Sequence, residues 1–426
     1  MLLSVPITYI KLQQGMFPMK LTALRSAILL SLIPTTSVFA AGLDRSGQSI
    51  AAFLQPGNYF EAGISILDPE VKGKDTSGNQ TGDMASDYYF PHAALKIQAT
   101  DHFSVGLIYD QPFGADAEYS GNSTFVENRP VPFQGGTSVT VDTQNLNLLF
   151  GYQPNENWNL YAGAVYQTVD GTVLLRGTTY SVFNGYDFRT GEDESVGWLA
   201  GVAYQIPEIA LKASVTYRSE IDHKMTADEN FGAAGFITGP ASALNPIMTA
   251  LNASSGETKL TTPQSVNVDF QTGIMANTVA FANVRWVDWS NFKVQPYNFA
   301  KLSQILGQSG LVADKPNGFN LIDYKEDQIS ATVGVGRKFN ERWGGNVSVG
   351  WDSGAGNPVT TLGPTEGFWS VGTGVRFSPA ENYFIGAGVK YFWLGDADAV
   401  TGAHSNAGKF TNNDAIAYGL NIGYKF

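Results

Sequence analysis

Apolar residues occupy every second position in a series of segments that runs from residue 58 to the end of the chain. In the last of them Tyr418, Leu420, Ile422, Tyr424 and Phe426 alternate with small or polar residues. This period of two places one set of side chains on each face of a β-strand. Fourteen such segments are predicted, at residues 58–71, 88–99, 102–110, 138–152, 157–176, 195–206, 209–225, 260–271, 278–294, 324–339, 343–352, 367–377, 382–394 and 414–426.

The connections between these segments alternate in length. Short ones lie near residues 100–101, 154–157, 207–208, 273–277, 340–342 and 378–381, and long ones occupy 72–87, 111–137, 177–194, 226–259, 295–323, 353–366 and 395–413. Outer-membrane barrels have short periplasmic turns and long outer loops, whereas a soluble β-sandwich has no reason to place every long loop at one end. The pattern therefore predicts an all-β protein, a 14-stranded antiparallel transmembrane β-barrel at residues 58–426. An edge strand of a soluble sandwich is the alternative for the last segment alone.

The residues before the first strand divide into two parts. Residues 1–40 are interpreted as a signal peptide that ends in Val38-Phe39-Ala40, with residues 1–18 as an upstream extension. Residues 41–57 alternate poorly. We expect them to form a short hatch-like segment, either in the periplasm or as a plug in the lumen.

Composition narrows the class of protein. The chain has 47 Gly, 12% aromatic and 15% charged residues, and no apolar run after residue 40 reaches the ~18 to 20 residues that a spanning helix needs. The absence of cysteine excludes disulfides, thiolate nucleophiles and zinc sites built from cysteine. Removal of residues 1–40 would change the formal net charge from −12 to −15, because this part contains three basic and no acidic residues. Such an acidic chain is not expected to bind nucleic acid.

Five short motifs occur in order along the strands: Leu67-Asp68-Pro69-Glu70-Val71, Asn145-Leu146-Asn147-Leu148, Tyr217-Arg218-Ser219-Glu220, Leu260-Thr261-Thr262-Pro263 and Asp288-Trp289-Ser290-Asn291-Phe292. In their order and spacing they resemble the FadL-type outer-membrane transporters of long-chain fatty acids, a family that also includes hydrocarbon importers. The resemblance covers the chain from the first strand to the end. The chain departs from the family pattern in residues 41–57, which are shorter than the usual hatch and lack its Asn-Pro-Ala motif.

The resemblance implies a fourteen-stranded barrel in the bacterial outer membrane that takes up hydrophobic molecules passively. Long-chain fatty acids are the first expected substrates, and small aromatic or aliphatic hydrocarbons are the alternative. The expected partners are the substrate, outer-membrane lipid and lipopolysaccharide, and the barrel assembly machinery, with the protein as a monomer. A surface adhesin or receptor is the alternative from another class.

The third strand is expected to break near its outer end. It continues into Asp110-Gln111-Pro112-Phe113-Gly114, where proline removes a donor from the ladder and glycine weakens pairing. In the family that it resembles, the matching strand has an inward kink through which a hydrophobic substrate leaves sideways, so Pro112, Phe113 and Gly114 are predicted to form such an exit. The alternative is that the strand ends at Asp110 and a loop begins.

Two outer loops are unusually apolar and are expected to contain helices. Asn245 followed by Pro246 is typical of a helix start. The predicted apolar faces consist of Phe236, Leu244, Ile247, Met248 and Leu251 in one loop and Phe299, Leu302, Ile305 and Leu306 in the other. Two such helices side by side would form an exposed groove for a hydrophobic substrate. Alternatively, they only pack on each other and cap the barrel.

Cationic residues near the strand ends are candidates for binding a substrate carboxylate. The resemblance places such an arginine near Arg176, and Lys325 is a second candidate. Arg218, Glu220 and Asp222 fall on one face of the predicted seventh strand and should form a lumenal ion-pair network.

An enzyme is not expected. The four histidines are His92, His102, His223 and His404, and Asp222 lies beside His223 on a strand, so the two point to opposite faces and form no dyad within it. We find no G-x-S-x-G motif for a nucleophile, and no cofactor or metal is expected. An outer-membrane hydrolase stays a weaker alternative.

Overall fold

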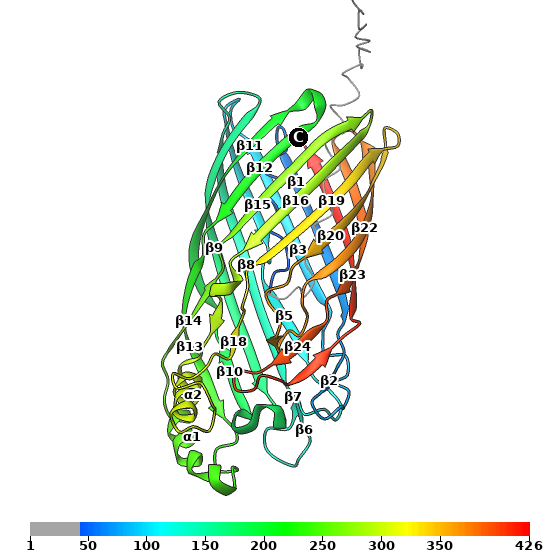
Figure 1. The fold of residues 1–426 in the computed structure, drawn as a ribbon. Coiled ribbons are helices and arrows are strands. Elements are labelled where there is room, and N and C mark those ends of the chain that lie inside the picture. The colour runs from blue at the N-terminus through cyan, green and yellow to red at the C-terminus, as the bar shows by residue number, and fades with distance from the viewer. Residues whose placement is uncertain (1–42) are drawn as a thin grey trace, which may run out of the picture.

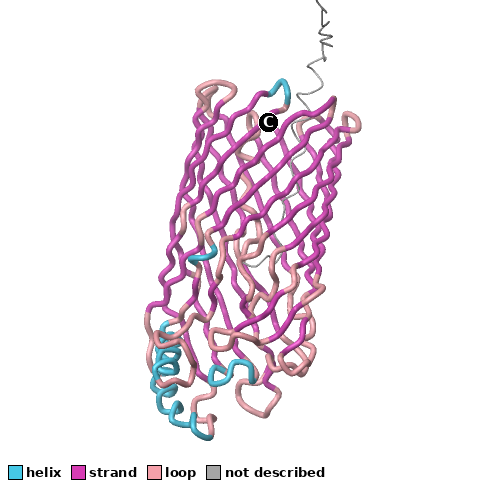
Figure 2. Tube along the Cα trace, in the orientation of Figure 1, coloured by secondary structure: helices cyan, strands magenta, loops and turns pink. Residues whose placement is uncertain are grey.

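Antiparallel strands run side by side around a closed barrel in the computed structural model, which describes residues 43–426 (Figure 1, Figure 2). Within these residues the chain crosses the barrel wall fourteen times, as predicted, and four crossings are split in two by a short interruption. The crossings are, in chain order, β1 (Tyr59–Glu70), β3 (Tyr88–Gln98), β4 (Phe103–Asp110) with β5 (Gly114–Glu118), β8 (Ser138–Tyr152), β9 (Trp158–Leu175), β10 (Tyr186–Thr190) with β11 (Asp193–Ile206), β12 (Leu211–Arg218) with β13 (Ile221–Phe231), β14 (Glu257–Thr262) with β15 (Ser265–Met275), β16 (Thr278–Val287), β19 (Gln328–Lys338), β20 (Trp343–Asp352), β22 (Phe368–Ala380), β23 (Tyr383–Leu394) and β26 (Asp414–Lys425).

The last strand closes the barrel. β26 pairs with β23 on one edge and with β1 on the other, from Tyr59 opposite Lys425 to Glu70 opposite Asp414. Its outward side chains are apolar and exposed, whereas Ala415 on its inner face is fully buried. Apolar side chains that face outwards are what a lipid environment requires. The predicted role of the terminal segment as a membrane strand is confirmed.

Long and short connections lie at opposite ends of the barrel (Figure 1). The long ones contain α1 (Leu244–Asn252) and α2 (Tyr297–Gln308). No described helix combines the length and the apolar character needed to cross a membrane. The smaller elements in the connections are β2 (Gly73–Asp75), β6 (Val126–Glu127), β7 (Gly135–Gly136), β17 (Lys293–Val294), β18 (Ile322–Asp323), β21 (Val359–Thr360), β24 (Ala397–Val400), β25 (Gly408–Phe410), η2 (Thr178–Phe183), η3 (Pro207–Ile209), η4 (Gly239–Ala243) and η5 (Trp289–Asn291).

Several predicted strand limits are wrong at the outer ends. The segment 209–225 is not one strand, because Ser219 and Glu220 separate β12 from β13. This two-residue interruption places both Arg218 and Ile221 on the inner face, which reverses the alternation beyond it. The segment 278–294 stops as a barrel strand at Val287, where η5 follows.

Residues 43–57 lie inside the barrel and not outside it. Ile50, Phe53 and Leu54 pack against inward side chains of β8, β9 and β11, such as Leu149 and Tyr161. We call residues 43–57 the plug. The predicted signal peptide, residues 1–40, lies outside the described residues.

Candidate functional site

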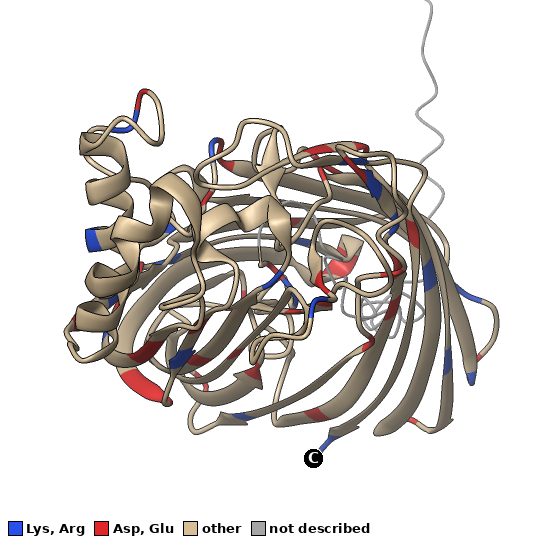
Figure 3. Ribbon diagram, turned by 90° about the horizontal axis from the view of Figure 1, so that it is seen from below, with Lys and Arg blue, Asp and Glu red and all other residues tan. Residues whose placement is uncertain are grey.

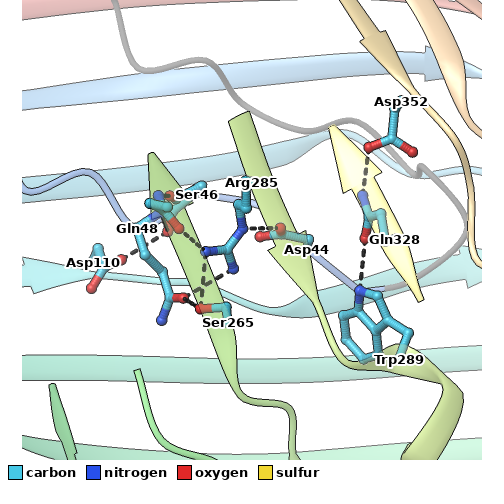
Figure 4. Close-up of polar contacts among 11 residues, drawn as sticks. Asp44, Ser46, Gln48, Asp110, Ser265, Arg285, Trp289, Gln328 and Asp352 are labelled. Carbon is cyan, nitrogen blue, oxygen red and sulfur yellow. Dashed lines mark hydrogen bonds and ion pairs between the residues drawn. The ribbon is translucent and has the colours of Figure 1, made fainter. Parts of the chain in front are cut away.

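A buried arginine of the wall holds the start of the plug. Arg285 on β16 donates from Nε to Asp44 Oδ2 over 2.6 Å, from Nη2 to Gln48 Oε1 over 2.9 Å, and from Nη1 to Asn267 Oδ1 over 2.7 Å (Figure 4). Ser46 of the plug donates a hydrogen bond to Asp110 Oδ2, 2.8 Å away, in the same view. Because both partners of the ion pair are almost fully buried, loss of either one would leave a buried charge without a partner.

Two lysines hold the other end of the plug. Lys96 on β3 donates to the carbonyl of Gln55 over 2.6 Å, and Lys212 on β12 donates to the carbonyl of Leu54 over 2.9 Å. Both carbonyls follow a helical turn in which Leu54 N–H bonds the carbonyl of Ile50. Cations favour the carbonyl end of such a turn. The plug is thus fixed to the wall at both ends.

The third crossing is interrupted and then resumes. Asp110, the last residue of β4, lies opposite Asn145 of β8, and Gly114, the first of β5, lies opposite Asp142. The kinked strand therefore holds one residue more than its partner over this distance, as in a β-bulge. The predicted break near Pro112 is present. The alternative, in which the crossing ends at Asp110 and only a loop follows, is wrong because β5 resumes the pairing with β8 at Gly114.

This interruption leaves a gap in the ladder between β3 and the kinked strand. β3 pairs with β4 only over residues 93–98, and residues 89–92 have no ladder partner on that edge within the described chain. The plug backbone approaches the gap from inside: Arg45 N–H bonds the Pro112 carbonyl at 2.7 Å, and Gly114 N–H bonds the Leu43 carbonyl at 2.8 Å. We call this place the wall gap.

Close packing at the wall gap requires glycine at position 114. A Cβ atom there would lie 2.0 Å from Cζ of Arg45. That guanidinium stacks on the ring of Tyr88, 4.1 Å from its centroid. Behind the gap lies a cavity of about 90 Å³ whose lining includes the carboxylates of Glu61, Asp110 and Asp269.

A second cavity, nearer the outer end, is almost wholly apolar. It has a volume of about 50 Å³, and we call it the outer pocket. Asp170 is the one ionisable side chain among its lining residues, which are Leu43, Phe113, Val141, Thr143, Val169, Asp170, Gly171, Thr172, Val173, Phe188, Thr190, Met225, Thr258, Leu260, Thr262, Pro263, Trp289, Phe292, Val294 and Ile322. The plug and the kink each contribute a residue, so movement of either would change the pocket.

A buried tryptophan forms one wall of the outer pocket, a role that no pattern in the sequence signals. The ring of Trp289 meets Phe113 edge to face at 5.5 Å between centroids. Its Nε1 donates to Gln328 Oε1 over 2.7 Å, and Gln328 Nε2 donates to Asp352 Oδ2 over 2.6 Å (Figure 4). Because the amide of Gln328 bonds both neighbours, the ring is held in one orientation. In the sequence Trp289 stands out only as part of the motif Asp288-Trp289-Ser290-Asn291-Phe292.

The predicted exposed groove on the outer helices is wrong. Nearly all of its residues are buried, because α1 and α2 pack into one apolar cluster with the outer loops: Leu244, Met248, Leu251, Phe299, Leu302 and Leu306 are buried, and Ile247 and Ile305 are partly so. Phe236 alone among the predicted residues is exposed. Figure 3, which looks into the barrel from this end, shows both helices at one side of the opening. We call this cluster the cap.

The two predicted carboxylate partners differ in environment. Arg176 is buried, and its Nη2 is bonded to Asp187 Oδ1 at 2.5 Å while Nη1 donates to the carbonyls of Leu175 and Tyr186. Lys325 is exposed in the loop before β19, which begins four residues later than predicted. Arg176 would have to leave Asp187 before it bound a substrate.

The predicted ion-pair network on the seventh crossing is wrong. Arg218 faces the lumen, but Glu220 and Asp222 face outwards, because the interruption after β12 shifts the alternation. Nε and Nη1 of Arg218 have no hydrogen-bond partner within the described residues. Sequence periodicity could not detect this shift, since the alternation is regular on both sides of it.

The chain matches known proteins over most of its length. A family model described as "Outer membrane protein transport protein (OMPP1/FadL/TodX)" matches residues 49–426. The long-chain fatty acid transport protein of Escherichia coli K12 is 23% identical over 393 residues, which are 83% of this chain and 81% of that protein. Its counterpart from Salmonella typhi is 23% identical over 390 residues, with the same coverage of both chains.

Solved structures show the same fold. A FadL homologue from Pseudomonas aeruginosa superposes with a TM-score of 0.66 at 16% identity, over 88% of this chain and 92% of the other. The toluene transporter TodX from Pseudomonas putida superposes with a TM-score of 0.60 at 12% identity, over 88% and 91% of the two chains. Identities this low establish the architecture but not the substrate.

Proposed function

The chain belongs to the FadL/TodX family of outer-membrane transport proteins, and on that basis we propose that it takes up uncharged hydrophobic molecules through the outer pocket. Transport is passive, down the concentration gradient of the substrate. The substrate leaves sideways at the wall gap. We expect the barrel to act as a monomer that the barrel assembly machinery inserts among outer-membrane lipid and lipopolysaccharide.

The lining of the outer pocket is the observation that supports this proposal. Its side chains are apolar or weakly polar, and the one ionisable group among them, Asp170, is acidic. An apolar ligand gains free energy there by leaving water. A carboxylate would find no cation in this lining to pair with. Hydrocarbons of the size of toluene fit this chemistry best.

Uptake of labelled toluene by cells with and without the gene tests the proposal. Replacement of Met225, which lines the outer pocket, by Asp should reduce uptake by about tenfold or more, because it buries a second charge against the substrate. Met275→Asp is the matched control, since Met275 is exposed beside a short turn. Equal uptake with and without the gene would refute the proposed function.

Long-chain fatty acids are a second candidate, named by the curated relatives and favoured by two cations that face the lumen. Lys390 on β23 lies 4.9 Å from the ring centroid of Phe392, and Arg376 on β22 stacks on Phe384 at 3.7 Å. Within residues 43–426 neither forms an ion pair, and Nη1 of Arg376 is buried without a hydrogen-bond partner. A substrate carboxylate would supply that partner.

Neutral replacement of the lumenal lysine separates the two candidates. If fatty acids are substrates, Lys390→Met should weaken oleate uptake severalfold and leave toluene uptake unchanged. Lys259→Met, at an exposed position on β14, controls for the loss of charge. Oleate uptake that is equal in the parent and in Lys390→Met would remove the lysine from the mechanism.

A further inference from the structure

A second stretch of the wall lacks its backbone ladder, between the sixth and seventh crossings. β11 pairs with β12 only from Leu199 opposite Arg218 towards the short turn, and β10 pairs with β13 only over residues 227–231. Residues 193–197 of β11 and 221–226 of β13 lie between these ladders, and within the described chain they form no ladder with each other. We call this stretch the seam.

Side chains close the seam where backbone bonds do not. His223 Nδ1 lies 2.9 Å from Asp193 Oδ2, and Ser195 Oγ donates to the Asp222 carbonyl over 2.7 Å. At the end of the seam that is nearer the short turns, a Cβ atom on Gly197 would lie 2.6 Å from Cγ1 of Ile221, so the two strands touch there. Rotation of a few side chains would therefore open the seam without breaking a strand ladder.

The seam lies directly over the outer pocket. Val169, the ladder partner of Asp193 on β9, lines the pocket, and so does Met225, the next inward residue after His223. The other ring nitrogen of His223 lies 3.0 Å from Gln167 Oε1, which also accepts from Thr262 Oγ1, and Thr262 lines the pocket. His223 thus separates the apolar pocket from the outside at this place.

The surroundings of the seam place it at the polar surface of the membrane. Trp198 follows the seam on the side of the short turns. It is 53% exposed and packs on Tyr217, as in an interfacial aromatic girdle. Between this girdle and the outer end of the barrel, Glu194, Asp222 and Lys224 face outwards. Charged outward residues exclude this level from the hydrocarbon, so the seam faces the headgroup layer.

The cap closes the direct route from the outer end. Phe183, Phe299 and Phe319 are buried in it, with the first two rings 4.4 Å apart between centroids. A molecule that came straight down the barrel would have to separate this packed cluster, whereas the seam is held by a few polar contacts.

We propose that the seam is a side entrance through which uncharged apolar molecules pass from the headgroup layer into the outer pocket. The inference rests on the proposed function and adds to it the point of entrance. Around the seam the carboxylates of Asp193, Glu194 and Asp222 outnumber the ammonium group of Lys224, so the seam repels anions. Neutral hydrocarbons are therefore admitted in preference to fatty-acid anions.

Reversible cross-linking tests the side entrance, because the chain has no cysteine. The double variant Asp193→Cys, His223→Cys is treated with a short bifunctional thiol reagent that reduction cleaves. Cross-linking should reduce toluene uptake at least tenfold, and cleavage should restore it. The matched control is Ala203→Cys, Ser214→Cys, a cross-strand pair in the regular ladder of β11 and β12, whose cross-linking should change nothing.

The outcomes separate this inference from the proposed function. Uptake by the parent protein together with undiminished uptake by the cross-linked seam variant overturns the side entrance alone. No uptake by the parent protein overturns the proposed function. Folding of each variant is checked by the heat-induced shift of barrels on gels. Should the double variant fail to fold, Ser195→Ala replaces it: we expect it to raise toluene uptake severalfold by removing one bond across the seam, and unchanged uptake counts against the proposal.

Discussion

The wall gap and the seam are both places where a closed barrel lacks backbone pairing, but they are closed by different means. At the wall gap the backbone of the plug bonds the kinked strand at Pro112 and Gly114. At the seam the bonds across the missing ladder come from side chains, such as Ser195 and His223. The first closure depends on a separate segment of chain, and the second depends on the two strands themselves.

The outward residues around the two openings differ as well. On β1 and β26, Ile64, Tyr418 and Leu420 are apolar and exposed, whereas Asp142 on β8, opposite Gly114, is 52% exposed and pairs with Arg45 of the plug. Backbone polar groups that face the membrane need partners. The plug supplies those partners at Pro112 and Gly114. Outward residues at the seam are charged, so water and headgroups satisfy its free edges. The wall gap is therefore covered from inside by the plug, and the seam is covered by side chains of its own two strands.

Release of the plug should affect the wall gap most strongly. Arg285→Met removes the partner of buried Asp44, at a cost of about 3 to 5 kcal/mol, so we expect the plug to leave the lumen and the ion conductance of single channels in planar bilayers to rise. Lys338→Met is the control, because its pair with Glu341 is exposed on the glutamate side and is worth about 0 to 1 kcal/mol. A plug that stays protected from protease in Arg285→Met would contradict this account.

Added bulk should separate the two openings. Gly114→Val at the wall gap forces Arg45 away from Tyr88, and overpacking of this kind costs about 1 to 3 kcal/mol. We expect toluene uptake to fall about tenfold. Gly197→Ala at the seam meets the flexible side chain of Ile221 and should change uptake about twofold or less. The comparison fails if the two variants lose the same amount of uptake.

Removal of one hydroxyl group at each opening is a finer test. Ser195→Ala deletes the bond to the Asp222 carbonyl at the seam. Tyr88→Phe deletes two bonds beside the wall gap, one donated to the Asp116 carbonyl and one accepted from the Asp116 N–H. Each bond is worth about 0.5 to 1.5 kcal/mol. Initial rates of toluene uptake should rise severalfold in the first variant and change little in the second, because the plug still covers the wall gap. The reverse order would mean that the exit limits transport.

The smallest effect concerns two outer loops, one that contains Glu127 and one that contains Asn184. Glu127 joins the two loops. This loop carboxylate accepts hydrogen bonds from Arg129 and from Asn184 of the loop that leads to the seam. The bonds to Arg129 hold the pKa of Glu127 at about 2, below its usual 4.5. Their contribution to stability is therefore complete above about pH 4.5 and is lost as the pH falls towards 2. Hydrogen exchange of residues 177–184 should rise over that range, and Glu127→Gln should show the faster exchange already at pH 7.

The sequence was sufficient to predict the number of crossings, because lipid on one side and lumen on the other impose a period of two on every strand. It also located the break near Pro112, where proline and glycine signal it. The interruption at Ser219 and Glu220 has no such signal. Regular alternation on both sides hides the change of face, so the lumenal ion-pair network was predicted wrongly.

The site depends mostly on contacts between distant parts of the chain, which periodicity does not reveal. Asp44 and Arg285 are 241 positions apart. The burial of α1 and α2 follows from packing against other outer loops, such as the one that contains Phe183, and an apolar helix face alone does not tell whether it meets a ligand or a neighbour. The side chains that close the seam come from strands whose register had to be known first.

The attachment of the plug constrains the order in which the protein can be assembled. The plug precedes the first strand, yet its ion-pair partner stands on the ninth crossing and the wall closes only when β26 meets β1. The earliest part of the chain must therefore stay unattached until most of the wall exists. Once β1 and β26 have joined, a plug left outside could enter only through an end of the finished cylinder. If the plug has not entered the lumen before β1 and β26 join, the product is an empty barrel. Substitutions at Asp44 should therefore be detected first as leakage through the outer membrane during growth.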